Sequence, residues 1–122
     1  MGRTLNILVV DDHADTLLML ARLVARLGHQ VTSAESCKAA RAAADAAGWQ
    51  FDMLLCDVGL PDGDGAELMA EFKRRCGCVT IALTGFGLDG DLARYSAHQV
   101  DQCLVKPVDF ALLKSVLAGE PA

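Results

Sequence analysis

The stretch Met53-Leu54-Leu55-Cys56-Asp57 places an apolar run directly before an aspartate. An earlier run, Ile7-Leu8-Val9-Val10, is followed in the same way by Asp11-Asp12. Short, continuous apolar runs rich in branched residues are typical of strands buried on both faces of a parallel sheet. Ligand sites in open α/β sheets form at the carboxyl ends of such strands. The two runs therefore predict an α/β fold with three carboxylates at one edge of the sheet.

Three carboxylates at one edge would repel one another, and a hard divalent cation relieves that repulsion. Mg²⁺ prefers oxygen ligands, and Mn²⁺ is an alternative. Asp11 and Asp12 could instead cap the helix that follows, since aspartate favours N-caps and the positive end of a helix dipole. A cap needs only one of them, so the pair together with Asp57 favours a cation-dependent pocket. His13, beside the pair, either tunes it electrostatically or lies in solvent.

The length and composition fit one ordinary domain. The chain has 122 residues, 52% of them hydrophobic, and a mean hydropathy of +0.30. We expect a single domain over residues 1–122, with its core at about 6–118. No apolar stretch approaches the roughly 18 residues of a membrane span, and residues 1–6 lack the apolar segment of a secretory signal. A soluble, cytoplasmic protein that does not enter a membrane is therefore expected.

Charge and cysteine content argue against two further classes of protein. The net charge of −5, from 16 acidic and 11 basic residues, disfavours a broad surface for nucleic acid. The five cysteines are odd in number and fall mostly in apolar segments, so we interpret them as reduced thiols. Cys76-Gly77-Cys78 is not a C-x-x-C motif and has no second Cys/His pair, which argues against a metal or redox site there.

Predicted strands and helices alternate along the whole chain. The predicted strands are Asn6–Val10, Gln30–Ala34, Phe51–Cys56, Val79–Leu83 and Gln102–Val105. The predicted helices cover about 14–27, 36–47, 66–75 and 91–97, and a last helix follows Asp109 with Phe110, Leu113, Val116 and Leu117 on its inner face. Ser36 and Asp109 are candidate N-caps, and Gly28 and Gly48 are helix stops. The glycines of 85–90 predict a mobile loop beside the pocket.

Five side chains at or just after the ends of these strands should converge on one edge, namely Asp11, Asp12, Asp57, Thr84 and Lys106. With Leu60-Pro61, Asp64-Gly65, Ala82-Leu83-Thr84-Gly85 and Leu104-Val105-Lys106-Pro107, the chain resembles the receiver domain of two-component response regulators from Ile7 to about Leu117. The resemblance implies a doubly wound, flavodoxin-like (βα)5 fold. Its sheet would have five parallel strands in the order 2-1-3-4-5, with helices on both faces.

The resemblance also implies the chemistry of the acidic residues. Asp57 would be the phosphoacceptor, which attacks a phosphohistidine on a partner and becomes an acyl phosphate. Asp11 and Asp12 would hold Mg²⁺, because a carboxylate that meets an anionic phosphoryl group needs its charge screened. The backbone carbonyl of Gly59 would be a further metal ligand.

The remaining motif residues imply how the phosphoryl group is stabilised and sensed. Lys106 would offer its charge to a phosphoryl oxygen, and Thr84 would offer a hydroxyl that moves on phosphorylation. A cis peptide bond between Lys106 and Pro107 is implied as well. Cys103 departs from the family, because most receivers have Tyr, Phe or His three residues before the lysine. We therefore expect a muted or rerouted conformational response.

The predicted function is a phosphoacceptor switch in a two-component phosphorelay, in which the domain itself catalyses only its own phosphorylation and dephosphorylation. The partners implied are a histidine kinase or a histidine phosphotransfer domain, and a downstream protein that binds the fourth helix, fifth strand and fifth helix. The end of the motif, Leu104 to Asp109, is similar to receivers attached to kinases, and a stand-alone receiver remains open.

Parts of the sequence pattern are also compatible with two other functions. The first is a phosphorylation-independent docking or dimerisation module, which Cys103 favours. The second is a Mg²⁺-dependent phosphohydrolase with an aspartyl-phosphate intermediate, similar to the haloacid dehalogenases. Adjacent Asp11-Asp12 do not match the D-x-D signature of that group, and the chain has no room for a cap domain to enclose a substrate.

Overall fold

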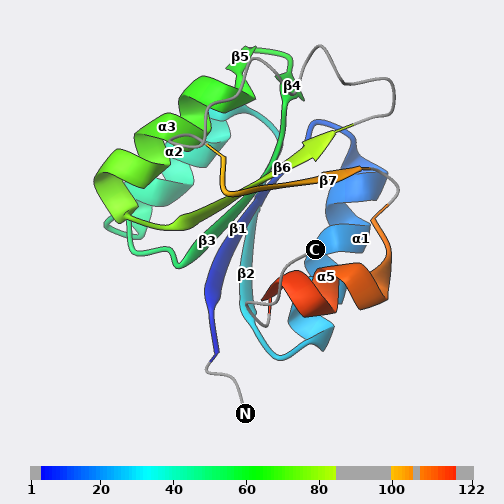
Figure 1. The fold of residues 1–122 in the computed structure, drawn as a ribbon. Helices are drawn as coiled ribbons and strands as arrows, with labels where there is room; N and C mark the ends of the chain where they lie inside the picture. Colours follow the sequence, from blue (N-terminus) through cyan, green and yellow to red (C-terminus); the bar gives the residue numbers. More distant parts are fainter. Residues whose placement is uncertain (1–3, 85–99, 106–107, 118–122) are drawn as a thin grey trace.

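The computed structural model describes residues 4–84, 100–105 and 108–117. Its main sheet has five parallel strands in the order β2-β1-β3-β6-β7, which confirms the predicted order. These strands are β1 (Asn6–Val10), β2 (Gln30–Ala34), β3 (Met53–Asp57), β6 (Val79–Thr84) and β7 (Gln102–Val105). The described helices are α1 (Ala14–Arg26), α2 (Cys37–Ala46), α3 (Gly65–Cys76) and α5 (Phe110–Leu117). Figure 1 shows α2 and α3 on one face of the sheet and α1 and α5 on the other.

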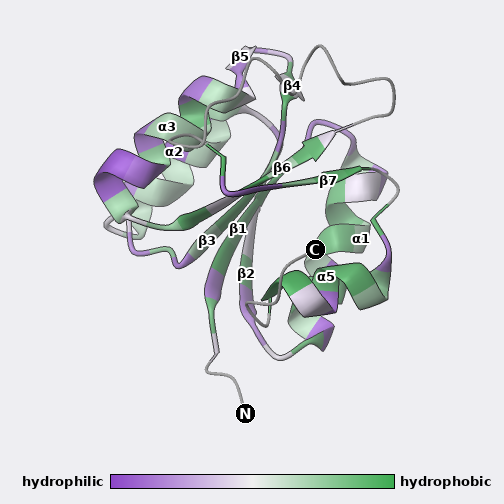
Figure 2. Ribbon diagram, viewed as in Figure 1, coloured by the Kyte–Doolittle hydropathy of each residue, from purple (hydrophilic) through white to green (hydrophobic). Residues whose placement is uncertain are grey.

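The continuous apolar runs serve two cores at once, because successive residues of a strand point to opposite faces. Leu8, Val10, Leu54 and Cys56 belong to the core under α2 and α3, whereas Ile7, Val9, Met53 and Leu55 belong to the core under α1 and α5. Each of these side chains is at most 5% exposed. In Figure 2 the central strands are accordingly hydrophobic along most of their length. The prediction of strands buried on both faces is confirmed.

The helix ends follow the predicted caps and stops. Gly28 lies just after α1 with a φ of +93°, a conformation that favours glycine. The Ser36 hydroxyl accepts a hydrogen bond from the Ala39 amide at 3.0 Å, and the Asp109 carboxylate accepts one from the Ala111 amide at 2.7 Å. Leu17, Leu20 and Val24 of the predicted α1 stripe are buried.

Three local features differ from the predictions. The segment predicted as a plain loop after Asp57 contains an antiparallel pair of two-residue strands, β4 (Gly59–Leu60) and β5 (Gly63–Asp64). Phe51 is buried but precedes β3, because the Asp52 side chain accepts the Asn6 amide at 2.8 Å and the ladder starts at Met53. Phe110, predicted on the inner face of the last helix, is only half-buried, and the Arg26 guanidinium lies over its ring, 5.4 Å from the centroid. The predicted loop 85–90 and helix 91–97 lie outside the described residues.

Asp101 attaches the start of β7 to the neighbouring strand. Its carboxylate accepts hydrogen bonds from the Lys73 ammonium at 2.6 Å and the Thr80 amide at 2.8 Å. Burial raises the pKa of this carboxyl group, but the bonds from Lys73 and Thr80 outweigh that effect, so its pKa is lowered. The attachment sets the register in which Thr84, at the end of β6, pairs with Val105.

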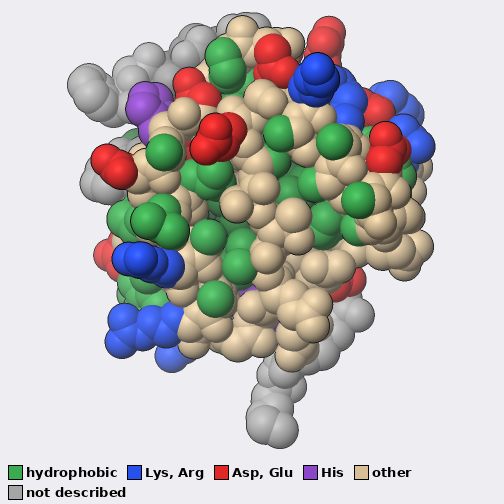
Figure 3. All heavy atoms as spheres, turned by 180° about the vertical axis from the view of Figure 1, so that it is seen from behind, with side chains coloured by type: hydrophobic (Ala, Val, Ile, Leu, Met, Phe, Trp, Pro, Cys, Tyr) green, Lys and Arg blue, Asp and Glu red, His purple; other side chains and the backbone are tan. Residues whose placement is uncertain are grey.

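The surface carries mixed charge. On the face shown in Figure 3, basic side chains form small separate groups with acidic side chains near them, so this face has no continuous basic patch. Within residues 4–84, 100–105 and 108–117, no helix combines the length and apolar character needed to cross a membrane.

Candidate acidic site at the carboxyl edge of the sheet

Strand register brings the acidic residues together. Val10 of β1 pairs with Cys56 of β3, and the two strands are parallel. Asp11 follows Val10 and Asp57 follows Cys56, so both aspartates lie at the same edge of the sheet. Asp11 is completely buried and Asp57 is 8% exposed, whereas Asp12 is exposed at the rim. The sheet edge therefore carries two carboxylates in a region of low solvent access and a third at its entrance.

The side chains of this edge are close enough to share one ion. Asp11, Asp12, His13 and Asp57 each offer one ligand atom, and these atoms all lie within 4.8 Å of one another. Three carboxylate oxygens form a donor set that suits Mg²⁺ or Mn²⁺. The predicted convergence of the three aspartates is therefore observed, and their donor chemistry fits the cation that the sequence predicts.

His13 also belongs to this cluster, which the sequence analysis did not include among the metal ligands. Its Nδ1 atom lies 3.2 Å from Asp12 Oδ1 and 3.5 Å from Asp11 Oδ1. The signal in the sequence was its position next to the acidic pair, but a histidine at a helix start is more often solvated, and spacing alone does not give the direction of the ring.

Backbone groups orient the two buried carboxylates. Asp11 Oδ1 accepts the His13 amide at 2.9 Å, and the Asp11 amide donates to the Ala34 carbonyl at 3.1 Å. Asp57 Oδ1 accepts the Gly59 amide at 3.1 Å. Gly59, predicted to contribute its carbonyl, therefore lies in β4 with its amide bonded to the Asp57 carboxylate.

The segment after Asp57 is attached to two helices. The Asp62 carboxylate accepts the Cys37 and Lys38 amides at 2.8 and 3.0 Å, at the start of α2. These backbone bonds, that from Lys38 first, lower the pKa of Asp62. Asp64 accepts the Ala66 amide at 2.8 Å and so caps α3. Both aspartates thus hold the loop rather than add to the acidic cluster.

Thr84 is the next predicted site residue along the edge. It is completely buried at the end of β6, and its hydroxyl donates to the Leu104 carbonyl at 3.3 Å. Lys106 and Pro107, together with the predicted cis peptide bond, lie outside the described residues. Of the predicted set, the structure therefore unites the three aspartates and places Thr84 at the end of the strand adjacent to β3.

The cysteines take no part in the acidic cluster through their thiols. All five are free in this structure, and their interpretation as reduced thiols stays a prediction. Cys103, at the position where the family usually has an aromatic ring, is half-buried and packs against the core under α2 and α3. Burial raises its pKa, and burial likewise raises the pKa of Cys78 to about 12.

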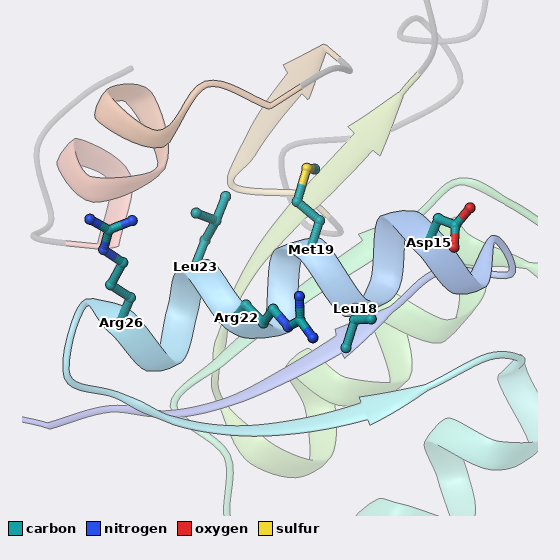
Figure 4. A pocket seen from close by; sticks show the side chains of 6 residues that line it. All are labelled: Asp15, Leu18, Met19, Arg22, Leu23 and Arg26. Atoms are coloured by element: carbon teal, nitrogen blue, oxygen red, sulfur yellow. The ribbon is translucent and has the colours of Figure 1, made fainter.

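A shallow pocket of about 340 Å³ runs along the outer face of α1. Its lining residues, shown in Figure 4, are Asp15, Leu18, Met19, Arg22, Leu23 and Arg26. Leu18 and Met19 are 52% and 40% exposed, so two adjacent large apolar side chains lie at this surface. Because α1 begins directly after His13, this surface adjoins the acidic site.

Comparison with known protein families gives one match over most of the chain. The model of the response regulator receiver domain matches residues 7–118. The chain is 30% identical to virulence sensor protein BvgS of Bordetella bronchiseptica, over 93% of this chain and 10% of that protein. It is 34% identical to sensor histidine kinase RcsC of Salmonella typhimurium, over 92% of this chain and 12% of that protein. The chain thus spans only about a tenth of the length of these relatives.

Solved structures show the same fold. A CheY-like receiver domain from Methylobacillus flagellatus superposes with a TM-score of 0.84 and 26% identity, covering 96% of this chain and 98% of that one. The chemotaxis protein CheY4 of Vibrio cholerae superposes with a TM-score of 0.84 and 24% identity, covering 94% and 97%.

The close approach of Gly65 to the backbone of Asp57 can be tested by substitution. A Cβ atom at Gly65 would lie 2.5 Å from the Asp57 carbonyl oxygen and 2.9 Å from the Val58 Cα, whereas one at Gly59 would meet nothing within 4 Å. We expect Gly65→Ala to lower the free energy of unfolding by about 1–3 kcal/mol, because the backbone beside Asp57 must move. The gain in helix propensity, about 1 kcal/mol at most, does not offset this.

Urea unfolding of Gly65→Ala and of Gly59→Ala as a matched control measures the difference. The control should stay within about 0.5 kcal/mol of the wild type, as surface substitutions usually do. A Gly65→Ala protein as stable as the control would show that the close approach to Asp57 is wrong.

Proposed function

The chain belongs to the family of response regulator receiver domains of two-component systems, and on that basis we propose that Asp57 accepts a phosphoryl group from a phosphohistidine. The observation that carries this proposal is the meeting of Asp11, Asp12 and Asp57, with their ligand atoms within 4.8 Å of one another. A pure scaffold needs no such cluster, which costs free energy through charge repulsion. We take residues 1–122 as one such receiver domain.

Asp57 has the chemistry of an acceptor nucleophile. One of its carboxylate oxygens forms a bond to phosphorus while the bond between phosphorus and the donor imidazole nitrogen breaks, which leaves an acyl phosphate and a neutral imidazole after proton uptake. The Gly59 amide, bonded to Asp57 Oδ1, keeps the carboxylate in a fixed direction during attack. When bound, a divalent cation supplies positive charge to the oxygens of both anions.

Four groups of the chain would hold that cation, as the resemblance to receiver domains implies. Asp11 and Asp12 contribute carboxylate oxygens, and Asp57 contributes a third. Gly59 would contribute its backbone carbonyl, and its amide already donates to Asp57 Oδ1 at 3.1 Å. We propose Mg²⁺ as the usual cation, with Mn²⁺ able to replace it.

Thr84 and Lys106 would stabilise and sense the phosphoryl group. The Thr84 hydroxyl would leave the Leu104 carbonyl for a phosphoryl oxygen, and the cost is small because a neutral bond of 3.3 Å is weak, worth about 1 kcal/mol or less. Lys106, one residue after the register partner of Thr84, would supply a point charge. Cys103 has no ring to bury, so we propose that the response along β7 and α5 is muted or takes another route.

We propose that the phosphohistidine donor docks on α1. A donor that reaches Asp57 must cover the surface beside the acidic edge, and α1 starts there. Leu18 and Met19 supply exposed apolar area, with Arg22 and Asp15 at its rim, a pattern typical of protein interfaces. The downstream partner would use the surface of the fourth helix, β7 and α5.

The relatives support a proposal about the donor and the cellular setting. RcsC is a sensor histidine kinase by name and BvgS is a virulence sensor protein. We propose on this similarity that the donor is a histidine kinase or a histidine phosphotransfer domain, in the cytoplasm. The domain would act as a phosphoacceptor rather than as an enzyme with an external substrate. Turnover of small phosphate esters would instead support the phosphohydrolase hypothesis.

The proposed function is tested by incubation with acetyl phosphate and intact-mass measurement. The wild type should gain one phosphoryl group when Mg²⁺ is present, and removal of the cation with a chelator should prevent the gain. Asp57→Asn should gain none. Asp45→Asn is the matched control, because Asp45 lies on α2 and bonds Trp49 outside the site. Equal phosphorylation of the Asp57→Asn variant would exclude Asp57 as acceptor.

The docking surface is tested by the double variant Leu18→Ser, Met19→Ser against phosphorylated histidine phosphotransfer domains. We expect the rate of transfer to fall about tenfold or more, because the apolar anchor area is lost. The rate with acetyl phosphate, which needs no docking, is the reference. Val79→Ser is the control, since Val79 is 41% exposed at the opposite end of the sheet. Equal losses in both variants would argue against α1 as the docking surface.

A further inference from the structure

We propose that His13 is an additional ligand of the divalent cation at the acidic site, and that it shifts the preference of this chain from Mg²⁺ toward borderline cations such as Mn²⁺. This inference rests on the cation site of the proposed function. It adds a nitrogen donor to a site that otherwise contains oxygen donors alone, and so predicts a property of this sequence rather than of every receiver.

The geometry of His13 carries the inference. Although 72% of the side chain is exposed, its Nδ1 atom faces the carboxylates, 3.2 Å from Asp12 Oδ1 and 3.5 Å from Asp11 Oδ1. A ring nitrogen of His13 also lies within 4.8 Å of the ligand atom of Asp57. A ring that served only solvation would have no reason to turn toward three acidic groups.

Backbone hydrogen bonds hold His13 at the rim of the site. His13 occupies the N-cap position of α1, but its side chain makes no capping hydrogen bond. Its amide donates to Asp11 Oδ1 at 2.9 Å, and its carbonyl accepts the Leu17 amide at 2.9 Å. Both backbone groups of His13 therefore form hydrogen bonds within the chain. The ring lies at the rim of the site and has no capping role in α1.

An ion pair with Asp12 is the alternative role for the ring. A protonated imidazole would neutralise part of the acidic charge, but it would have no lone pair on Nδ1 to give to a metal. The two roles can be distinguished, because only a metal ligand forms a bond between the imidazole nitrogen and the cation. An ion pair also gives no reason for one divalent cation to be preferred over another.

Metal chemistry predicts the direction of the selectivity. Mg²⁺ demands oxygen ligands and gives up its waters reluctantly, so a nitrogen donor adds little to its binding. Imidazole binds borderline transition cations well, and their affinity for a given nitrogen and oxygen site rises from Mn²⁺ through Co²⁺ to Zn²⁺ in the general order of divalent metals. His13 should therefore raise the affinity for Mn²⁺ relative to that for Mg²⁺.

The experiment uses Mn²⁺ as the probe, on the unphosphorylated chain at about pH 8, where most free imidazole is neutral. Electron spin-echo envelope modulation detects nitrogen-14 bonded to Mn²⁺. We expect imidazole modulation in the wild type and its loss in His13→Gln. His29→Gln is the matched control and should keep the modulation, because His29 Nδ1 accepts the Leu5 amide at 2.9 Å, at the other end of β1.

Calorimetric titration of the same variants measures selectivity. We expect His13→Gln to weaken Mn²⁺ binding roughly tenfold and to change Mg²⁺ binding by less than about twofold. Identical modulation in the wild type and His13→Gln, or equal weakening for both cations, would overturn the inference. Neither result would affect Asp57 phosphorylation in Mg²⁺, so failure of this inference remains distinct from failure of the proposed function.

Discussion

The mutual repulsion of three carboxylates is the constraint on which the rest of this structure depends. Asp11, Asp12 and Asp57 bring their oxygens within 4.8 Å of one another, and Asp11 is fully buried. Such an arrangement opposes folding unless other interactions hold it. The two central strands provide them, because their apolar runs fill a core on each side of the sheet and deliver the acidic residues to the same edge. The apolar contacts in the middle of the sheet thus offset the repulsion among the carboxylates at its edge.

The two flanks of the acidic edge differ in how firmly they are held. On one side, Asp62 and Asp64 attach the segment after Asp57 to α2 and α3, and Gly65 allows the backbones to approach closely. On the other side, the Thr84 hydroxyl makes a long hydrogen bond of 3.3 Å to the Leu104 carbonyl. In the proposed function, attack by Asp57 and cation binding would depend on the firmly held side, whereas a conformational response to phosphorylation would depend on the weakly held side. Cys103, on β7 beside that second flank, offers no ring to extend the movement.

Much of this arrangement could be predicted because it depends on strand ends. Continuous apolar runs indicated the central strands, and the residue after each run fell at the acidic edge. The β4 and β5 pair was missed because two-residue strands are too short to show a hydrophobic period. Phe51 was assigned to a strand from its apolar character, but the pairing of Asp52 with Asn6 decides where the ladder begins. His13 was missed because ring direction depends on atomic contacts, and Leu18 and Met19 because the α1 stripe used Leu17, Leu20 and Val24.

The most direct test of the account is the dependence of stability on Mg²⁺, measured as the free energy of unfolding of the wild type and Asp12→Asn at about pH 8. Without Mg²⁺, the variant should be more stable, because one repelling charge is gone. The wild type should gain roughly 2.7 kcal/mol when Mg²⁺ is present at 100 times its dissociation constant, and the variant should gain far less under the same conditions. Equal responses of the two proteins to Mg²⁺, or no response in either, would contradict the claim that these carboxylates form one cation-dependent site.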